Sequence, residues 1–388
     1  MSDGSHDMQS DAAQGDAAQS DAAQGDAAQG DAAQSDAAQR VAPKISVLVP
    51  VYRFEVGPLA TSLARMARDL DGAIEVRLLD DGTPDAGLRL ENRAAIESAD
   101  RSISYSELEQ NVGRARARNH LAEGAQGDFL LFLDADVLPD GSDFFERYLR
   151  WIEADAGDVA CGGLSYEQRI RRGREYRFHL ALARSTELLR PEEKSVEPWR
   201  HLTTANLLVR RSLFASIPFD PEFSGYGYED SEWGIRVSRC ARVSFIENSV
   251  SHLGLIEERE LVARTARSLP NFRRLADLHP AEFSRLPIAR LVRPLRRVPA
   301  PLLATADYLL GTTTRLCPVS RAKVLSFQLK KAVGLAREFR RSEKPRSLGS
   351  SSGSTGPTPH SSGESKVTTP GRSTGDRPKP NGARGTPS

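Results

Sequence analysis

A run of five apolar residues followed by two aspartates constrains the fold of this chain most. Residues 129–133 read Phe-Leu-Leu-Phe-Leu, and Asp134 and Asp136 follow directly. A continuous apolar run of this length is typical of a strand buried on both faces, as in a parallel sheet. Carboxylates at the end of a buried strand need partners, because burying an unpaired charge is costly. A divalent cation, Mg2+ or Mn2+, would be such a partner. A surface Asp pair that caps the next helix is the alternative.

Both ends of the chain differ in composition from its middle. Residues 11–40 are six copies of Asp-Ala-Ala-Gln, each followed by Gly, Ser or Arg. Residues 342–388 are dominated by Ser, Gly, Pro and Thr. Neither segment has enough apolar surface to offset the entropy of ordering it, so we expect residues 1–40 and 342–388 to be disordered. Roughly 300 residues remain, which is ample for a full core.

Charge and cysteine content exclude several classes of protein. The formal net charge is +1, so no global field recruits nucleic acid. Cys161, Cys240 and Cys317 are too widely spaced for a metal-ligand pattern or a disulfide framework. The N-terminus lacks the pattern of a signal peptide, and the longest apolar runs fall far short of the ~20 residues of a membrane helix. We therefore expect a soluble cytoplasmic protein.

Residues 45–133 alternate between strand and helix patterns. The expected strands are 45–52, 74–79, 103–105 and 129–133, and the expected helices are 57–70, 88–98 and 113–126. This alternation predicts a parallel α/β sheet with right-handed crossovers. In such sheets ligands bind beyond the carboxyl ends of the strands.

Polar residues follow three of these strands at their carboxyl ends. Pro50-Val51-Tyr52 ends the first, Asp80-Asp81-Gly82 the second and Asp134-Ala135-Asp136 the last. The two aspartates before Gly82 also suit an ordinary turn. No Gly-x-Gly-x-x-Gly or Walker lysine loop follows the first strand, which argues against dinucleotide binding and ordinary ATP hydrolysis.

The second half of the folded region contains another acidic segment. A strand is expected at 203–209, and residues 219–233 then combine a flexible Gly-aromatic loop with the carboxylates of Glu229, Asp230 and Glu232. An alternative interpretation is that these three acidic residues only stabilise the N-terminus of a helix through its dipole. A strand at 243–246 and His252 follow, and a lone histidine is often structural.

Taken in order, these motifs resemble family 2 glycosyltransferases of the GT-A fold. The resemblance extends from about Ile45 to His252 and rests on the motifs at 49–52, 80–85, 111–119 and 133–136. Residues 225–236 resemble the Trp-Gly-Gly-Glu-Asp/Asn segment of galactosyl- and N-acetylgalactosaminyltransferases, including bacterial chondroitin-polymerase types. The chain departs from the pattern at Arg53, where Asn is frequent, and at Tyr226 and Tyr228, which replace Trp and Gly.

The resemblance implies a role for each matching residue. The nucleotide-sugar would contact Pro50, Tyr52, Asp81, Arg118 and Asp134. Asp136 and His252 would bind the divalent cation. Asp230 would be the catalytic base, with Glu229 beside it at the acceptor. The acceptor sugar would stack on Tyr226, Tyr228 and Trp233. Arg118 alternatively lies on an open helix surface.

The implied fold is a mostly parallel nucleotide-binding sheet flanked by helices, with a catalytic domain at 41–280. The implied reaction is an inverting, metal-dependent transfer of a sugar from a nucleotide-sugar, a UDP-sugar above all. Its acceptor would be a hydroxyl of a glycan or a lipid-linked glycan. A nucleotidyltransferase on a similar sheet and a non-catalytic nucleotide- or glycan-binding module are the alternatives.

Residues 281–341 form a basic extension with helical spacing of its apolar residues. Leucines, isoleucine and valine at 286–295 are interleaved with arginines. This pattern fits peripheral contact with the inner face of an anionic membrane. The alternative, which the pattern favours, is a helix packed on the catalytic domain with its arginines in solvent.

Overall fold

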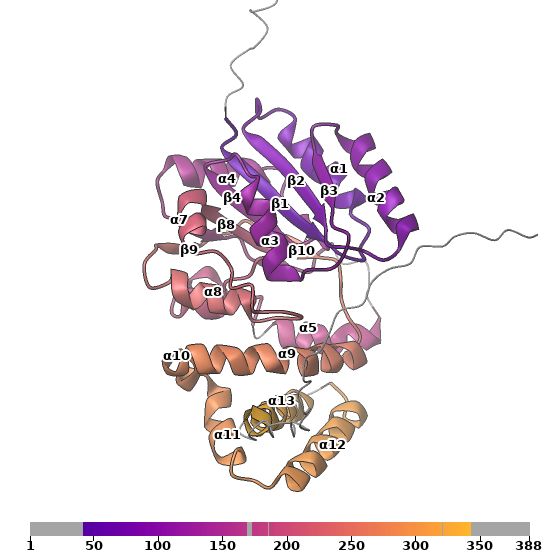
Figure 1. The fold of residues 1–388 in the computed structure, drawn as a ribbon, viewed down its shortest axis with the longest axis vertical. Helices are drawn as coiled ribbons and strands as arrows, with labels where there is room; N and C mark the ends of the chain where they lie inside the picture. The colour runs from indigo at the N-terminus through magenta and orange to yellow at the C-terminus, as the bar shows by residue number, and fades with distance from the viewer. Residues whose placement is uncertain (1–41, 169–172, 185, 320, 343–388) are drawn as a thin grey trace, which may run out of the picture. The chain divides into compact units, whose positions relative to one another are not determined.

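The computed structural model describes residues 42–168, 173–184, 186–319 and 321–342 (Figure 1). The segments for which the composition predicts disorder, 1–40 and 342–388, lie outside this range except for residue 342, and those predictions stay untested. Among the described residues no helix is long and apolar enough to cross a membrane.

A seven-stranded sheet in the order β3-β2-β1-β4-β8-β6-β9 forms the centre of the fold (Figure 1). The four strands expected in the first half are all present, as β1 (Ile45–Val51), β2 (Ile74–Asp80), β3 (Ser104–Glu107) and β4 (Phe129–Leu133). The others are β6 (Val159–Cys161), β8 (Asn206–Arg210) and β9 (Val243–Phe245). Only β8 runs antiparallel to its neighbours, so the mostly parallel sheet is confirmed.

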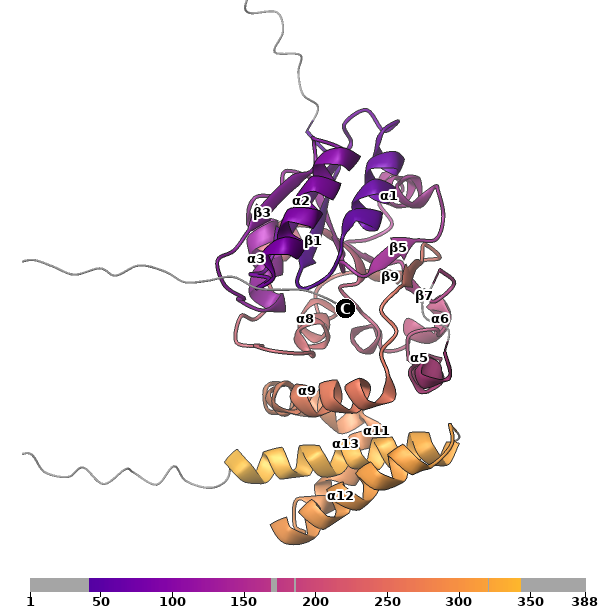
Figure 2. The same ribbon diagram turned by 90° about the vertical axis from the view of Figure 1, so that its right-hand side faces the viewer.

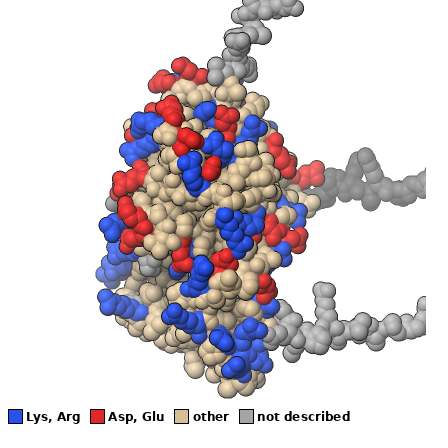
Figure 3. All heavy atoms as spheres, turned by 90° about the vertical axis from the view of Figure 1, so that its left-hand side faces the viewer, with Lys and Arg blue, Asp and Glu red and all other residues tan. Residues whose placement is uncertain are grey.

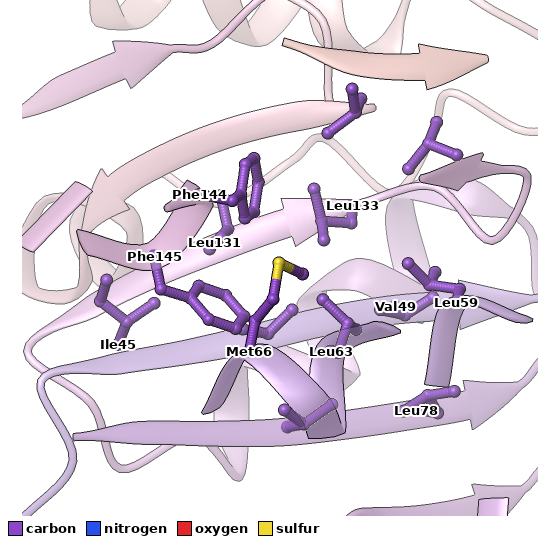
Figure 4. Packing of buried hydrophobic residues seen from close by; sticks show 14 of the residues in the cluster. Ile45, Val49, Leu59, Leu63, Met66, Leu78, Leu131, Leu133, Phe144 and Phe145 are labelled. Carbon is purple, nitrogen blue, oxygen red and sulfur yellow. The ribbon is translucent and has the colours of Figure 1, made fainter. Parts of the chain in front are cut away.

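Helices cover both faces of this sheet (Figures 1 and 2). One core cluster joins the sheet to α1 (Gly57–Ala67), α2 (Ala86–Ala99) and α4 (Phe144–Glu153). A second joins the opposite face to α3 (Arg114–Glu123), α7 (Arg211–Ser216) and α8 (Glu229–Val237). In β1, Ile45, Val47, Val49 and Val51 belong to the first cluster and Leu48 to the second, and all five residues of β4 are buried. Figure 4 shows the first cluster, with α1 side chains lying over the strands.

A smaller sheet lies beside the end of β4. It consists of β5 (Val137–Pro139), β10 (Val250–His252) and β7 (Leu164–Ser165), in the order β5-β10-β7. The antiparallel register of β5 and β10 sets His252 opposite Val137, one residue after Asp136. The two short helices α5 (Arg177–Ala183) and α6 (Pro191–Lys194) follow β7 along the chain.

Five helices complete the described chain: α9 (Glu258–Leu278), α10 (Pro280–Arg285), α11 (Pro287–Leu295), α12 (Ala300–Leu316) and α13 (Arg321–Ser342). They share one apolar cluster, so the helical layer begins at α9, before the boundary expected at 280. Most of the apolar residues of 286–295 pack into this cluster, with Val292 only 1% exposed and Leu291 at 38%. Residues 286–295 therefore pack largely against other helices, as the second interpretation of this segment expected.

Candidate active site

A buried arginine joins the two acidic segments at the carboxyl edge of the sheet. Arg118, on α3, is only 1% exposed. Its Nη2 donates to Asp134 Oδ1 at 2.6 Å, and its Nη1 donates to Glu229 Oε1 at 3.3 Å. Asp134 follows β4 directly, whereas Glu229 begins α8. The interpretation of Arg118 as an open-surface residue is therefore wrong, because its side chain connects the Asp134-Asp136 motif to the Glu229-Asp230 motif.

A second arginine, Arg114, adds positive charge one helical turn earlier. Its Nη1 lies 3.9 Å from Glu229 Oε1. The charges of Asp134, Glu229 and Asp136 all raise the pKa of Arg114 against the opposing effect of burial. Burial alone would raise the pKa of Asp134, but the charges of Arg118 and Arg114 and the hydrogen bond from Arg118 lower it. Asp134 is therefore an anion held between two cations.

Asp230 differs from these paired carboxylates. It is half-buried, and its Oδ1 accepts a hydrogen bond from the backbone N–H of Ser231 at 2.7 Å. Burial, and then the neighbouring charge of Glu229, raise the pKa of Asp230 to about 7. A carboxylate with a pKa near neutrality is suited to accept a proton during catalysis. Glu229 itself is 3% exposed, and its Oε1 faces the two arginines, so the expected acceptor contact of Glu229 stays a prediction.

Asp136 and His252 lie side by side, as expected for two ligands of one cation. His252 Nε2 is 3.5 Å from Asp136 Oδ2, and both side chains are partly exposed. Two adjacent ligand atoms at about 2.1 Å from an ion lie roughly 3 Å apart, so the spacing fits a shared cation. A Cβ at Gly254 would lie 2.7 Å from Asp136 Oδ2, so glycine leaves space for this carboxylate. No group of three or more His, Cys, Asp and Glu side chains is placed to hold a metal within the described ranges.

The hydrogen bonds of His252 also matter for metal binding. The Gly254 N–H donates to His252 Nδ1 at 3.1 Å. A neutral ring that accepts at Nδ1 has its proton on Nε2, which faces Asp136. Coordination through Nε2 would require the proton to move to Nδ1 and this hydrogen bond to break.

The expected nucleotide contacts lie at the ends of β1 and β2. Asp81 is 4% exposed, and its carboxylate accepts from Val112 N at 2.7 Å, Asn111 Nδ2 at 2.9 Å and Gly113 N at 3.1 Å. Burial nevertheless raises the pKa of Asp81. Asp81 therefore holds the loop before α3 in place, whereas an aspartate in an ordinary turn would bond only to its own turn. Tyr52 is 41% exposed beyond the end of β1, and Pro50 is half-buried within β1.

The three aromatic residues expected at the acceptor divide into three environments. Trp233 is fully buried, and its Nε1 donates to Ile217 O at 2.7 Å, so the expectation that it stacks on a sugar is wrong. Tyr228 stacks on Phe272 of α9 with ring centroids 4.4 Å apart, which occupies one of its faces. Tyr226 is half-buried, with the Arg114 guanidinium 4.8 Å from its ring centroid.

The loop that contains these tyrosines is attached to the helical layer. Asn271 Nδ2 on α9 donates to Ser224 O and to Gly227 O, both at 2.9 Å. The glycines of the loop predict that it is flexible, but these hydrogen bonds from α9 hold it in place on one side. Sequence reasoning missed Asn271 and Arg114, because an Asn or Arg within a helix gives no local signal of such a role.

Sequence reasoning also missed a polar cluster behind His252. The rings of Tyr166 and His179 lie near that of His252, with centroids 5.9 and 6.3 Å away. The Tyr166 hydroxyl donates to Glu187. Burial, and then the charges of His252 and Arg264, lower the pKa of His179 to about 4, so this ring is neutral. Tyr166 directly follows β7, His179 lies on α5 and Glu187 precedes α6, and the sequence pattern did not resolve these segments.

Comparison with known proteins finds similarity to glycosyltransferases. Residues 46–217 match the family model described as glycosyl transferase family 2. An uncharacterized glycosyltransferase of Bacillus subtilis is 24% identical over 246 residues, covering 51% of this chain and 61% of its own length. An N-acetylglucosaminyltransferase of Rhizobium meliloti is 32% identical over 98 residues, covering 25% of this chain and 23% of its own. The chain thus matches less than two thirds of each of these relatives.

Among solved structures, the fold is similar to a mannosyltransferase from Pyrobaculum calidifontis in complex with GDP-Man and Mn2+. The TM-score is 0.51 at 15% sequence identity, over 78% of this chain and 89% of the other. At this identity the likeness concerns the fold alone. Residues 46–217 of this chain therefore match glycosyl transferase family 2, and the described fold is of the GT-A type.

Proposed function

We propose that this protein transfers a sugar from a nucleotide-sugar to an acceptor hydroxyl with inversion at the anomeric carbon. The observation that carries the proposal is the pair of contacts from Arg118 to Asp134 and Glu229. These contacts bring the expected donor side of the site and the expected base, Asp230, to one edge of the sheet. The family match supports glycosyl transfer over nucleotidyl transfer or simple binding.

In this proposal each residue has a separate task. Asp81 orders the loop beside the nucleobase, and Tyr52 and Pro50 shape the same pocket. A divalent cation held by Asp136 and His252 would offset the negative charge that develops on the leaving diphosphate. Asp230 accepts the proton of the attacking hydroxyl as the new glycosidic bond forms. A single base opposite the leaving group is sufficient for one displacement with inversion.

The nucleotide and the acceptor are proposed at the level of chemical class. We infer a UDP-sugar donor from the resemblance of residues 225–236 to galactosyl- and N-acetylgalactosaminyltransferases. The mannosyltransferase of similar fold was solved with Mn2+, which supports a divalent cation here. The acceptor is a hydroxyl of a glycan or of a lipid-linked glycan.

Replacing Asp136 tests the cation site. We expect Asp136→Ala to lower the rate of nucleotide release from a UDP-sugar in Mn2+ by at least about 100-fold, because one side-chain ligand of the ion is lost. UDP binding in Mn2+, measured by calorimetry, should weaken in parallel, whereas Mn2+-independent thermal stability should change little. Asp128→Ala, at the opposite edge of the sheet, is the control. Equal release rates and UDP affinities in Asp136→Ala and wild type would remove the role assigned to Asp136.

We also propose that α12 contacts an anionic membrane surface. Thirteen large apolar side chains are exposed in the described chain, and six of them lie between residues 302 and 325. Leu302, Leu309 and Leu316 repeat every seven residues on α12 and are 60%, 57% and 79% exposed. Asp307, paired with Lys330 and Arg337, is the sole acidic residue from 283 to 337, a segment with many arginines. Figure 3 shows the prevalence of basic residues on one side of these helices.

Liposome sedimentation tests this surface. We expect the full chain to sediment with phosphatidylglycerol vesicles but not with phosphatidylcholine vesicles, because apolar burial and charge attraction act together. Replacing Leu302, Leu309 and Leu316 with Gln should lower the bound fraction at least about tenfold. Leu90→Gln, which alters an exposed leucine on α2, should bind like wild type. Unchanged sedimentation of the triple variant refutes the proposal, and a change in its oligomeric state instead assigns the face to a second copy.

A further inference from the structure

A cavity of about 450 Å3 lies at the carboxyl edge of the sheet, beyond β8. Its walls come from the segments that follow β6 and β9, from α6 and from α4. Because β6 and β9 run parallel to β4, their ends point to the same edge as Asp134. The strand order places β1, β2 and β3 on one side of β4, and this cavity on the other. The cavity is therefore on the side of the site away from the proposed nucleotide pocket.

The cavity is within electrostatic range of the proposed catalytic base. Cys161, the last residue of β6, lines it. Burial, and to a smaller extent the charge of Asp230, raise the pKa of this thiol, so Asp230 is within range of electrostatic interaction with the cavity wall. An acceptor whose hydroxyl reaches Asp230 would extend into this space.

One buried cation in the cavity has no partner of its own. Lys194, the last residue of α6, lines the cavity and is 7% exposed. Within the described part of the chain its Nζ makes no hydrogen bond and no ion pair. Glu187 is an acidic group that acts on Lys194, but its carboxylate accepts from Tyr166. Burial lowers the pKa of Lys194. An ammonium on a largely buried side chain is only partly solvated, and an anion bound in the cavity would offset that cost.

The other charges of the cavity are already engaged or exposed. Asp140 accepts hydrogen bonds from the hydroxyls of Ser165, Ser249 and Ser251, each at 2.6 Å, and Glu247 is exposed at the rim. Arg147 lines the cavity too, with its Nε donating to Asp143 and its Nη1 to Glu247 O. Lys194 is thus the charged group that remains available for a ligand inside the cavity.

We propose that this cavity binds an oxyanion of the acceptor, a carboxylate, phosphate or sulfate group, on the Lys194 ammonium. The inference rests on the proposed transferase function, since it makes the occupant of the cavity the acceptor. The cavity would make the enzyme selective for an acceptor that has a negative charge near the hydroxyl that reacts. A carbohydrate with an acidic residue or a phosphate-linked carrier has this chemistry.

Inorganic sulfate is the first probe of the cavity. The titration is done with saturating UDP and Mn2+, so that the diphosphate position is filled and only further anion binding is measured. We expect sulfate to raise the melting temperature of the wild type, and Lys194→Met to lower the sulfate affinity at least about tenfold. Lys44→Met, which removes an exposed lysine paired with Asp128 at the other edge of the sheet, is the control and should respond like wild type. Equal sulfate stabilisation of wild type and Lys194→Met overturns the proposal.

Stability without sulfate separates a binding lysine from a structural one. Lys194→Met keeps the apolar stem and removes an unpaired charge, so its melting temperature should equal or exceed that of the wild type. Lys194→Arg keeps the charge and should keep the sulfate response. The proposal is contradicted if Lys194→Met loses stability, Lys194→Arg restores it, and neither variant responds to sulfate. That result assigns Lys194 a structural role.

Acceptor analogues decide whether the anion belongs to the acceptor. Methyl β-glucuronide should compete with sulfate in the wild type, whereas methyl β-glucoside should not. In Lys194→Met the two sugars should have the same effect on sulfate binding. Sulfate binding without glucuronide competition limits the cavity to a free anion and overturns the acceptor assignment. If UDP itself does not bind in the presence of Mn2+, the proposed transferase function is wrong. That result differs from an equal sulfate response of wild type and Lys194→Met, which overturns only the proposal for the cavity.

Discussion

Asp230→Asn should abolish most of the turnover while leaving donor binding intact. The carboxylate is the single group proposed to accept the proton of the attacking hydroxyl, and a general base contributes roughly 100- to 10,000-fold to such a step. Asn keeps the shape of the side chain and its hydrogen bond from Ser231 N. The measurement is nucleotide release from the sugar nucleotide that the wild type hydrolyses fastest, together with the affinity for UDP in Mn2+. We expect the rate to fall by that factor and the affinity to change less than threefold.

Glu222→Gln is the matched control for this variant. Glu222 lies in the same acidic segment, is well exposed and forms only a 3.7 Å pair with Arg116. Its neutralisation should leave the rate unchanged. If Asp230→Asn releases nucleotide as fast as wild type, the base is another residue and the proposed mechanism is wrong.

The pH dependence gives a second readout of the same carboxylate. With the pKa of Asp230 raised to about 7, the base is protonated at low pH, so kcat/KM should rise with pH and level off above about 7. The residual rate of Asp230→Asn should lack this rise. Stability depends on pH in the opposite direction. Between the ordinary pKa of 3.8 and about 7, the folded state binds more protons than the unfolded state. The free energy of unfolding therefore falls as the pH rises. Asp230→Asn should therefore melt higher than the wild type at pH 8 but not at pH 4.

The sheet could be predicted from the sequence because its signals are local. The apolar runs of β1, β2 and β4 and the Pro, Gly and Asp residues at their ends define strands without reference to any other part of the chain. The motif order then indicated which strand ends meet. In contrast β5 and β10 have three residues each, which is too short for a periodic pattern, and the placement of His252 beside Asp136 depends on their pairing.

Residues whose roles depend on distant partners could not be predicted. An arginine on a helix is ordinarily exposed, and the Glu229 partner of Arg118 is 111 residues away in the sequence. Trp233 was misassigned because an aromatic residue next to a carboxylate motif suggests sugar stacking. The register of α8 instead directs this indole into the core between the helix and the sheet, where Phe214 and Phe219 contact it. Lys194 gave no signal either, because the burial of its side chain depends on how α6 packs against β9.

Arg118→Gln should destabilise the fold more than any other single substitution at this edge of the sheet. The guanidinium is 1% exposed and is the closest cation to both Asp134 and Glu229. Removing one partner of a buried ion pair costs about 3–5 kcal/mol, because the remaining charges are left without compensation. The melting temperature should therefore fall on the order of 10 °C. Circular dichroism during thermal unfolding measures this change, and turnover at a temperature where the variant is folded should also fall.

Arg116→Gln provides the comparison that makes this prediction specific. Arg116 lies on the same helix, two residues before Arg118, but its side chain is 53% exposed and its pair with Glu222 is in solvent. Such surface pairs contribute about 0–1 kcal/mol, so this variant should unfold close to wild type. Adding Glu229→Gln to Arg118→Gln should recover part of the lost stability, since it removes one of the two uncompensated carboxylates. If Arg118→Gln and Arg116→Gln unfold at the same temperature, Arg118 does not join the two acidic segments, and the geometry on which the proposed reaction depends is refuted.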